Sequence, residues 1–94
     1  MAWIPTAVDL SNNIVTVKTT PVDVKGIFVN TVMSAHACNI NDGATTKFII
    51  PASSAAGTVI DFAGEEGVEF NTNLIVDPDD SATGNITILF KNKA

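Results

Sequence analysis

Short runs of strand-forming residues, separated by turn-forming ones, fill this chain from residue 14 almost to its end. Val, Ile and Thr account for 31 of the 94 residues, and their branched Cβ atoms favour an extended, pleated backbone over a helix. No segment of useful length has a helical period, whereas short runs at spacings of about ten residues are typical of two packed antiparallel sheets. The pattern therefore predicts an all-β protein.

The expected strands are short and lie between clear turn signals. Pro21 cannot donate to a ladder, Asn41-Asp42-Gly43 contains residues that accept a positive φ, and residues 51–57 form a loop of small side chains. The strands left between these signals are residues 14–18, 23–31, 35–41, 47–50, 58–62, 68–70, 74–76 and 85–91. We expect a single antiparallel β-sandwich of about eight short strands, for which the jelly roll is one arrangement.

The last strand shows plainly which side chains face the core. Ile86, Ile88 and Phe90 lie at alternating positions and share one face of a strand. The residues between them, which include Thr87 and Lys91, share the other face. We expect the Ile, Ile and Phe face to be buried.

The long second strand is apolar on both faces. With strict alternation, Val24 and Phe28 fall on one face and Ile27 and Val29 on the other, and Gly26 could open a bulge between them. A strand that is apolar on both sides belongs at the centre of a sheet or beneath an interface. We therefore count Ile27 and Val29 among the candidate partner-interface residues.

Residues 1–12 differ from the rest of the chain, because Trp3, Ile4 and Pro5 lead into a polar, turn-forming stretch. We expect an extended N-terminal arm at residues 1–12 and a β-sandwich domain at residues 13–94. The arm could fold as a lid over one end of the core, or it could reach a neighbouring subunit. For the second case Trp3, Ile4 and Pro5 complete the candidate interface, since a large rigid aromatic side chain is a favoured interface anchor.

The charge balance argues against nucleic acid and membranes as partners. The net charge is -5, arginine is absent and the five lysines are spread along the chain, so bidentate phosphate recognition has no donor. No apolar run approaches the roughly 20 residues of a membrane helix, and no basic or hydrophobic leader is visible. We expect a protein made in the cytoplasm. Its 16% of charged residues, against the usual 25% or so, predicts a surface rich in uncharged contacts.

His36 and Cys38 are the one histidine and the one cysteine, and they could share a face of a strand. A zinc site needs three or four N or S ligands, and a cysteine nucleophile needs a base within hydrogen-bonding distance. In a strand, the Cα atoms of residues two positions apart lie roughly 7 Å from each other. We expect a buried thiol beside a partly exposed ring, with no catalytic role.

Two acidic stretches are weaker candidates. Residues 77–84 could hold calcium through clustered oxygens, but the spacing departs from an EF-hand loop, and a solvated turn explains it as well. Glu65, Glu66 and Glu69 resemble a glycosidase carboxylate pair only in type, because one flexible turn cannot place carboxylates on opposite faces of a sugar. We expect no metal, no cofactor and no enzymatic activity.

Several strand and turn segments follow one another in a known order: residues 25–30, 40–43, 57–60, 67–70, 74–76 and 84–90. This order resembles the small β-sandwich virion proteins of tailed bacteriophages, and the likeness covers roughly residues 14–91. Where that family has a glycine before a Leu-x-Val segment, this chain has Asn73, and asparagine is the next best residue at a left-handed φ. The family's Asp-Gly hairpin is matched by Asp42-Gly43.

The resemblance implies a non-enzymatic structural protein of the virion. The expected role is a capsid decoration or cement protein that trimerises and bridges neighbouring subunits of the major capsid protein on the capsid surface. The alternative is a tail or vertex surface protein, or an adaptor that binds a receptor or a glycan. A glycan-binding face usually presents several aromatic side chains, and this chain has no tyrosine and one tryptophan.

Overall fold

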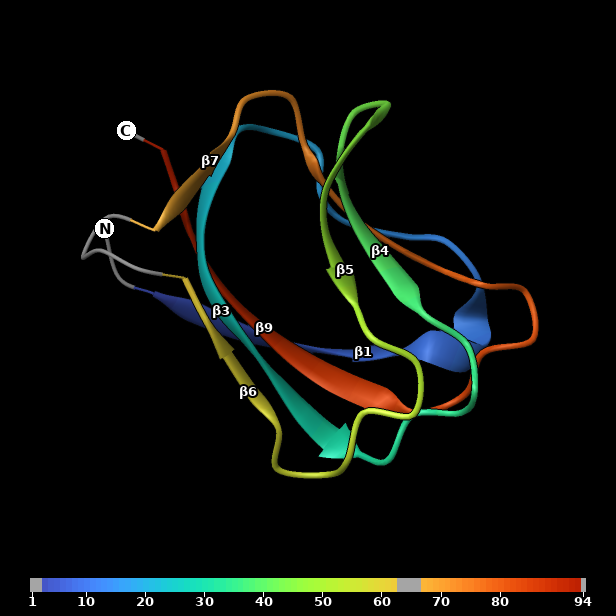
Figure 1. Ribbon diagram of the computed structural model, residues 1–94. Helices are drawn as coiled ribbons and strands as arrows, with labels where there is room; N and C mark the ends of the chain where they lie inside the picture. Colours follow the sequence, from blue (N-terminus) through green and yellow to red (C-terminus); the bar gives the residue numbers. More distant parts are fainter. Residues whose placement is uncertain (1–2, 63–66, 94) are drawn as a thin grey trace.

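The computed structural model describes residues 3–62 and 67–93. Within them, nine strands form two antiparallel sheets, and one short 3-10 helix follows β1 (Figure 1). The β3–β9 sheet contains β1 (Ile4–Asp9), β9 (Asn85–Asn92), β3 (Val22–Thr31), β6 (Val59–Asp61) and β7 (Val68–Phe70). The β4–β8 sheet contains β2 (Val15–Lys18), β8 (Leu74–Pro78), β4 (Cys38–Asp42) and β5 (Thr45–Ile50). The predicted all-β sandwich is confirmed.

The strands pair in a nested order, first with last. In one sheet β1 pairs with β9, and β3 pairs with both β6 and β7; in the other, β2 pairs with β8 and β4 with β5. The short strands β6 and β7 lie end to end along one edge of β3, at Gly26 to Phe28 and at Val22 to Val24 respectively. This nesting is the connectivity of a jelly roll in which β6 and β7 share one strand position.

The start of the chain is a strand, which the sequence reading missed. β1 pairs with β9 from Ile4 opposite Phe90 to Asp9 opposite Asn85, and the 3-10 helix at Leu10–Asn12 buries Leu10 completely. The strand was not expected because this segment contains Pro5, and proline argues against a strand inside a sheet. Proline is compatible with edge strands, and β1 is an edge strand. Residues 4–12 thus lie within the sandwich and do not project from it as an arm.

A β-bulge in β3 changes which of its side chains face the core. The register with β9 shifts between Val24 and Gly26, so Lys25 is an extra residue and the alternation is reset. Val24, Ile27 and Val29 are therefore all buried, while Phe28 points outward with 43% of its surface exposed. The expected bulge and central position of β3 are confirmed, but the assignment of Ile27 and Val29 to a partner interface is wrong, since both lie in the core.

The core is filled by side chains from both sheets. Ile86, Ile88 and Phe90 are at most 4% exposed, as the alternation in β9 predicts. Toward one side of the sandwich the rings of Phe48 and Phe62 stack with their centroids 3.9 Å apart. Aliphatic and aromatic side chains thus close the space between the sheets, and this burial supplies most of the stability of such a fold.

One carboxylate joins two turns at the end of the β4–β8 sheet. Asp42 accepts hydrogen bonds from the backbone N–H groups of Asn71 and Thr72, both at 2.8 Å, and of Asn73 at 3.3 Å. The Asn73 side chain in turn accepts from the Gly43 N–H at 2.8 Å. The expected left-handed φ at Asn73 is wrong, because in residues 3–62 and 67–93 the non-glycine residues with a positive φ are Asn13 and Ser53.

These contacts predict an acid-sensitive stability. Burial on its own would raise the pKa of Asp42, but the three backbone N–H donors and Lys47 outweigh it and lower the pKa below its ordinary 3.8. The ionised carboxylate therefore contributes stability above pH 3.8, and this contribution is lost as the pH falls through the lower folded pKa. We expect Asp42→Asn to reduce the free energy of unfolding by about 1 kcal/mol at pH 7 and by much less at pH 2.5.

Urea unfolding at both pH values measures this difference. Asp80→Asn is the matched control, because it removes an exposed carboxylate outside the two turns that Asp42 joins. An Asp42→Asn defect of equal size at both pH values would contradict the assignment.

Candidate interaction face

The outer face of the β3–β9 sheet is unusually poor in charge at its middle. One row of cross-strand partners runs through four strands and contains no charged residue: Ala7, Thr87, Phe28 and Val59. Phe28 is 43% exposed and Val59 is 65% exposed. A solvent-facing sheet surface normally carries polar side chains, so this uncharged row is a candidate contact surface.

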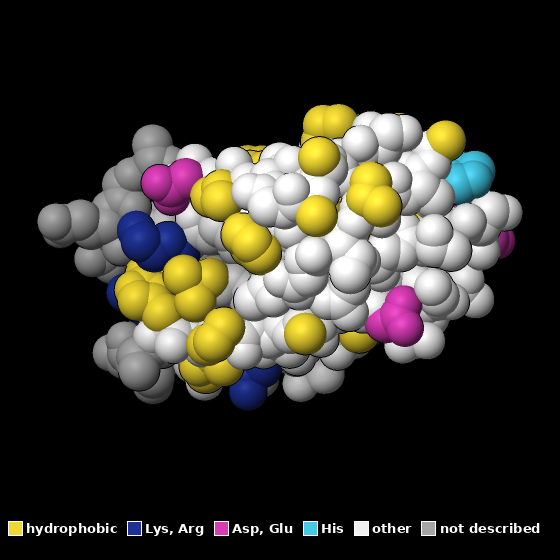
Figure 2. Space-filling model, turned by 90° about the horizontal axis from the view of Figure 1, so that it is seen from below, with side chains coloured by type: hydrophobic (Ala, Val, Ile, Leu, Met, Phe, Trp, Pro, Cys, Tyr) yellow, Lys and Arg dark blue, Asp and Glu magenta, His cyan; other side chains and the backbone are white. Residues whose placement is uncertain are grey.

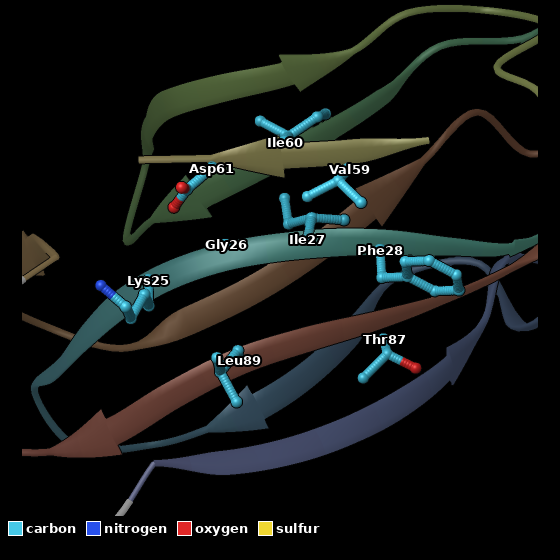
Figure 3. A pocket seen from close by; sticks show the side chains of 9 residues that line it. All are labelled: Lys25, Gly26, Ile27, Phe28, Val59, Ile60, Asp61, Thr87 and Leu89. Atoms are coloured by element: carbon cyan, nitrogen blue, oxygen red, sulfur yellow. The ribbon is translucent and has the colours of Figure 1, made fainter. Parts of the chain in front are cut away.

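A hollow of about 260 Å³ lies beside the uncharged row (Figure 3). We call it the outer groove. Gly26 contributes no side chain there, and Lys25 and Phe28 stand at its two ends along β3. A Cβ at position 26 would lie 2.8 Å from the carbonyl oxygen of Ile60, so the close approach of β6 requires glycine. The residues that line the groove are Lys25, Gly26, Ile27, Phe28, Val59, Ile60, Asp61, Thr87 and Leu89.

Hydrogen-bonded polar residues border the uncharged row on one side. The side-chain amide of Asn30 donates to Asn85 at 2.7 Å and to Thr87 at 2.8 Å. These bonds join β3 to β9 across the sheet surface. The polar groups at this end are thus paired within the chain.

Charged residues border the face at the opposite end. Lys93 Nζ lies 2.6 Å from Glu69 Oε2 and 3.2 Å from Asp23 Oδ1. The hydrogen bond to Glu69 raises the pKa of Lys93, and the bond to Lys93 lowers the pKa of Glu69. Viewed from below, the molecule carries apolar and uncharged side chains across its middle and charged ones toward its margins (Figure 2).

The predicted interface residues at the start of the chain lie beside this face. Lys25 Nζ and Lys91 Nζ lie 5.6 Å and 4.7 Å from the centre of the Trp3 ring, so Trp3 is held by cation–π contacts. Trp3 is half-buried, Ile4 is 39% exposed and Pro5 is exposed. These three residues form a partly exposed, largely apolar segment at the start of edge strand β1, and Trp3 adjoins the outer groove through Lys25.

His36 and Cys38 do not form a functional pair. Cys38 is fully buried at the start of β4, where burial first and the nearby Asp77 second raise the pKa of its thiol to about 12. His36 instead places Nδ1 3.5 Å from Asp79 Oδ1 near the surface. A thiol that stays protonated at neutral pH is a poor nucleophile and a poor metal ligand.

The acidic stretch at residues 77–84 starts at the end of β8 and continues into a turn. Asp79 accepts from the Ser81 N–H at 2.9 Å, and its own carbonyl accepts from the Ala82 N–H at 2.9 Å. Asp77 lies 3.4 Å from the Asn41 amide, which donates to it. Among the described residues, no group of three or more His, Cys, Asp or Glu side chains is placed to hold a metal ion. Glu65 and Glu66 lie outside the described residues.

Phe28, Val59 and Leu89 are the surface residues that sequence reasoning missed. The available signal was the apolar character of both faces of residues 23–31 next to Gly26. The convergence of these three side chains depends on the register of β3 with β6 and β9, which no local pattern encodes.

No helix in residues 3–62 or 67–93 is long and apolar enough to cross a membrane. In comparisons with family models, curated proteins and solved structures, nothing matches this chain.

The buried thiol gives a direct test of the core assignment. We expect Cys38 in the folded protein to react with a thiol reagent at pH 8 at least about 100-fold more slowly than in 8 M urea, because the thiolate is scarce and the sulfur is covered. Absorbance of the released reagent measures the rate. A Cys38→Ala variant that carries Thr16→Cys is the exposed-thiol control. Equal rates for Cys38 and the control would place Cys38 at the surface.

Proposed function

We propose that this chain is a non-enzymatic structural protein of a tailed-bacteriophage virion, a capsid decoration or cement protein that binds subunits of the major capsid protein. The observation that carries the proposal is the partly exposed, largely apolar segment at the start of edge strand β1, formed by Trp3 just before the strand and by Ile4 and Pro5 within it. The spacing of strands and turns that resembles virion β-sandwich proteins points in the same direction.

The attachment would rest on hydrophobic burial rather than on ion pairs. The chain has five lysines, no arginine and 16% charged residues, and exposed ion pairs contribute little binding free energy in any case. Burial of apolar surface contributes about 25 cal/mol per Å². In the described part of the chain, no strand pairs with the outer edge of β1, so its backbone could also pair with an extended segment of a capsid subunit.

The chemistry of the described side chains supports a contact protein over a catalyst. The Cys38 thiol is buried and protonated, His36 pairs with Asp79, and the outer groove has apolar walls with charges only at Lys25 and Asp61. Catalytic sites gather a nucleophile, a base and a group that orients them, and a binding face needs the uncharged surface seen here.

The copy number in purified virions tests the location. We expect hundreds of copies per particle by quantitative mass spectrometry, as for a protein that covers the capsid. Three to about a dozen copies would instead support the tail or vertex alternative, and complete absence from virions would refute the proposal.

Trp3→Ala tests the attachment edge. We expect the variant to bind capsids from which this protein has been removed at least about tenfold more weakly, because an aromatic anchor and its contacts are lost. Co-sedimentation with capsids measures the affinity, and thermal unfolding confirms that the sandwich remains folded. Deletion of residues 1–6 is not a clean test, since it would remove half of β1.

Val32→Ala is the matched control, because Val32 is 62% exposed and follows Thr31, at the opposite end of the sheet from Ile4. We expect it to bind capsids as the unchanged protein does. Trp3→Ala protein that binds with unchanged affinity would refute the role of this edge, whatever the copy number.

A further inference from the structure

The outer groove suits one large side chain better than a small-molecule ligand. Its volume of about 260 Å³ lies below the range of roughly 300–1,000 Å³ that is usual for ligand pockets. Its walls are mostly apolar, and polar side chains stand only at the rim, at Lys25, Asp61 and Thr87. A leucine or phenylalanine side chain from another protein surface would fit into such a hollow.

The groove and a side chain that could fill it lie next to each other on one strand. Phe28 stands at one end of the groove and is 43% exposed, and Gly26 leaves the strand surface bare two residues away (Figure 3). Residues two apart in a strand are separated by roughly 7 Å. A projection and a hollow side by side on one face make that face self-complementary, which is the requirement for a two-fold contact.

We propose that a second copy of this chain covers the outer face of the β3–β9 sheet. A two-fold axis that crosses β3 near Ile27 places Phe28 of each copy in the outer groove of the other. Val59 and Leu89 then surround the inserted ring. The charged residues at the end of the face, Lys93 among them, then lie at the margin of this contact.

The dimensions of the face indicate how much surface two copies would bury. Four strands at a spacing of about 4.8 Å and the eight residues of β9 at about 3.4 Å each span roughly 19 by 27 Å. Two copies would thus bury roughly 1,000 Å² in total, which is close to the lower limit for a specific interface. The dimer is therefore expected to dissociate on dilution.

This arrangement leaves the edge of β1 in each copy at the side of the contact. One dimer would then present two attachment edges, which is what bridging two capsid subunits requires. The dimer itself does not depend on the proposed virion role. A trimer, which the resemblance implies, needs a contact between two different surfaces and would not use this self-complementary pair.

Sedimentation equilibrium of the purified full chain tests the proposal. We expect a monomer–dimer equilibrium for the unchanged protein, and Phe28→Asp should raise its dissociation constant at least about 30-fold, as loss of a central aromatic contact does. Ile49→Asp is the matched control: Ile49 is 59% exposed on β5 of the other sheet. The control should change the constant less than threefold, and thermal unfolding should show both variants folded.

The contact itself is tested by NMR on a mixture of ¹³C-labelled and unlabelled protein. We expect intermolecular NOEs between the Phe28 ring and the methyl groups of Leu89 and Val59. A monomer at 1 mM, a trimer, a dimer that Phe28→Asp leaves intact, or intermolecular NOEs confined to other surfaces would each overturn the proposal. Binding of the monomer to capsids would be unaffected by these results, so the two proposals can fail separately.

Discussion

The pairing of β3 with β9 is the contact on which the rest of the structure depends. β3 is the longest strand and pairs with three others, so its register determines what all of them present to the core. The extra residue at Lys25 resets the alternation and turns Ile27 and Val29 inward and Phe28 outward. A single bulge thus completes the core and also creates the outer groove, because both follow from the same shift of side chains between faces.

The remainder of the fold holds this sheet against its partner. Phe48 and Phe62 stack between β5 and the end of β6, and Asp42 ties the β4–β5 hairpin to the turn before β8. The chain has a single cysteine and hence no internal disulfide, so apolar packing and backbone-to-carboxylate bonds have to hold a domain of 94 residues together. A second copy on the uncharged face would add to that limited burial.

Several polar side chains of the described residues bond to other groups within the fold or are buried in it. Asn30 joins two strands, Lys93 pairs with two carboxylates, and the Cys38 thiol is sealed in the core. Among the described residues, the start of β1 and the uncharged row with its groove offer apolar surface to partners. Contact surfaces of this kind gain affinity from shape and apolar area, which fits a structural role better than a chemical one.

The sequence by itself determined the class of fold and the inward face of β9, because both depend on local propensity and on a strict period of two. It also placed a bulge near Gly26 and a buried thiol at Cys38. The tertiary structure decided that residues 4–9 form an edge strand, that Ile27 is buried, and that Phe28, Val59 and Leu89 meet around one hollow. These features depend on the register between strands far apart in the chain, which is fixed by packing of the whole sandwich and not by any local run of residues.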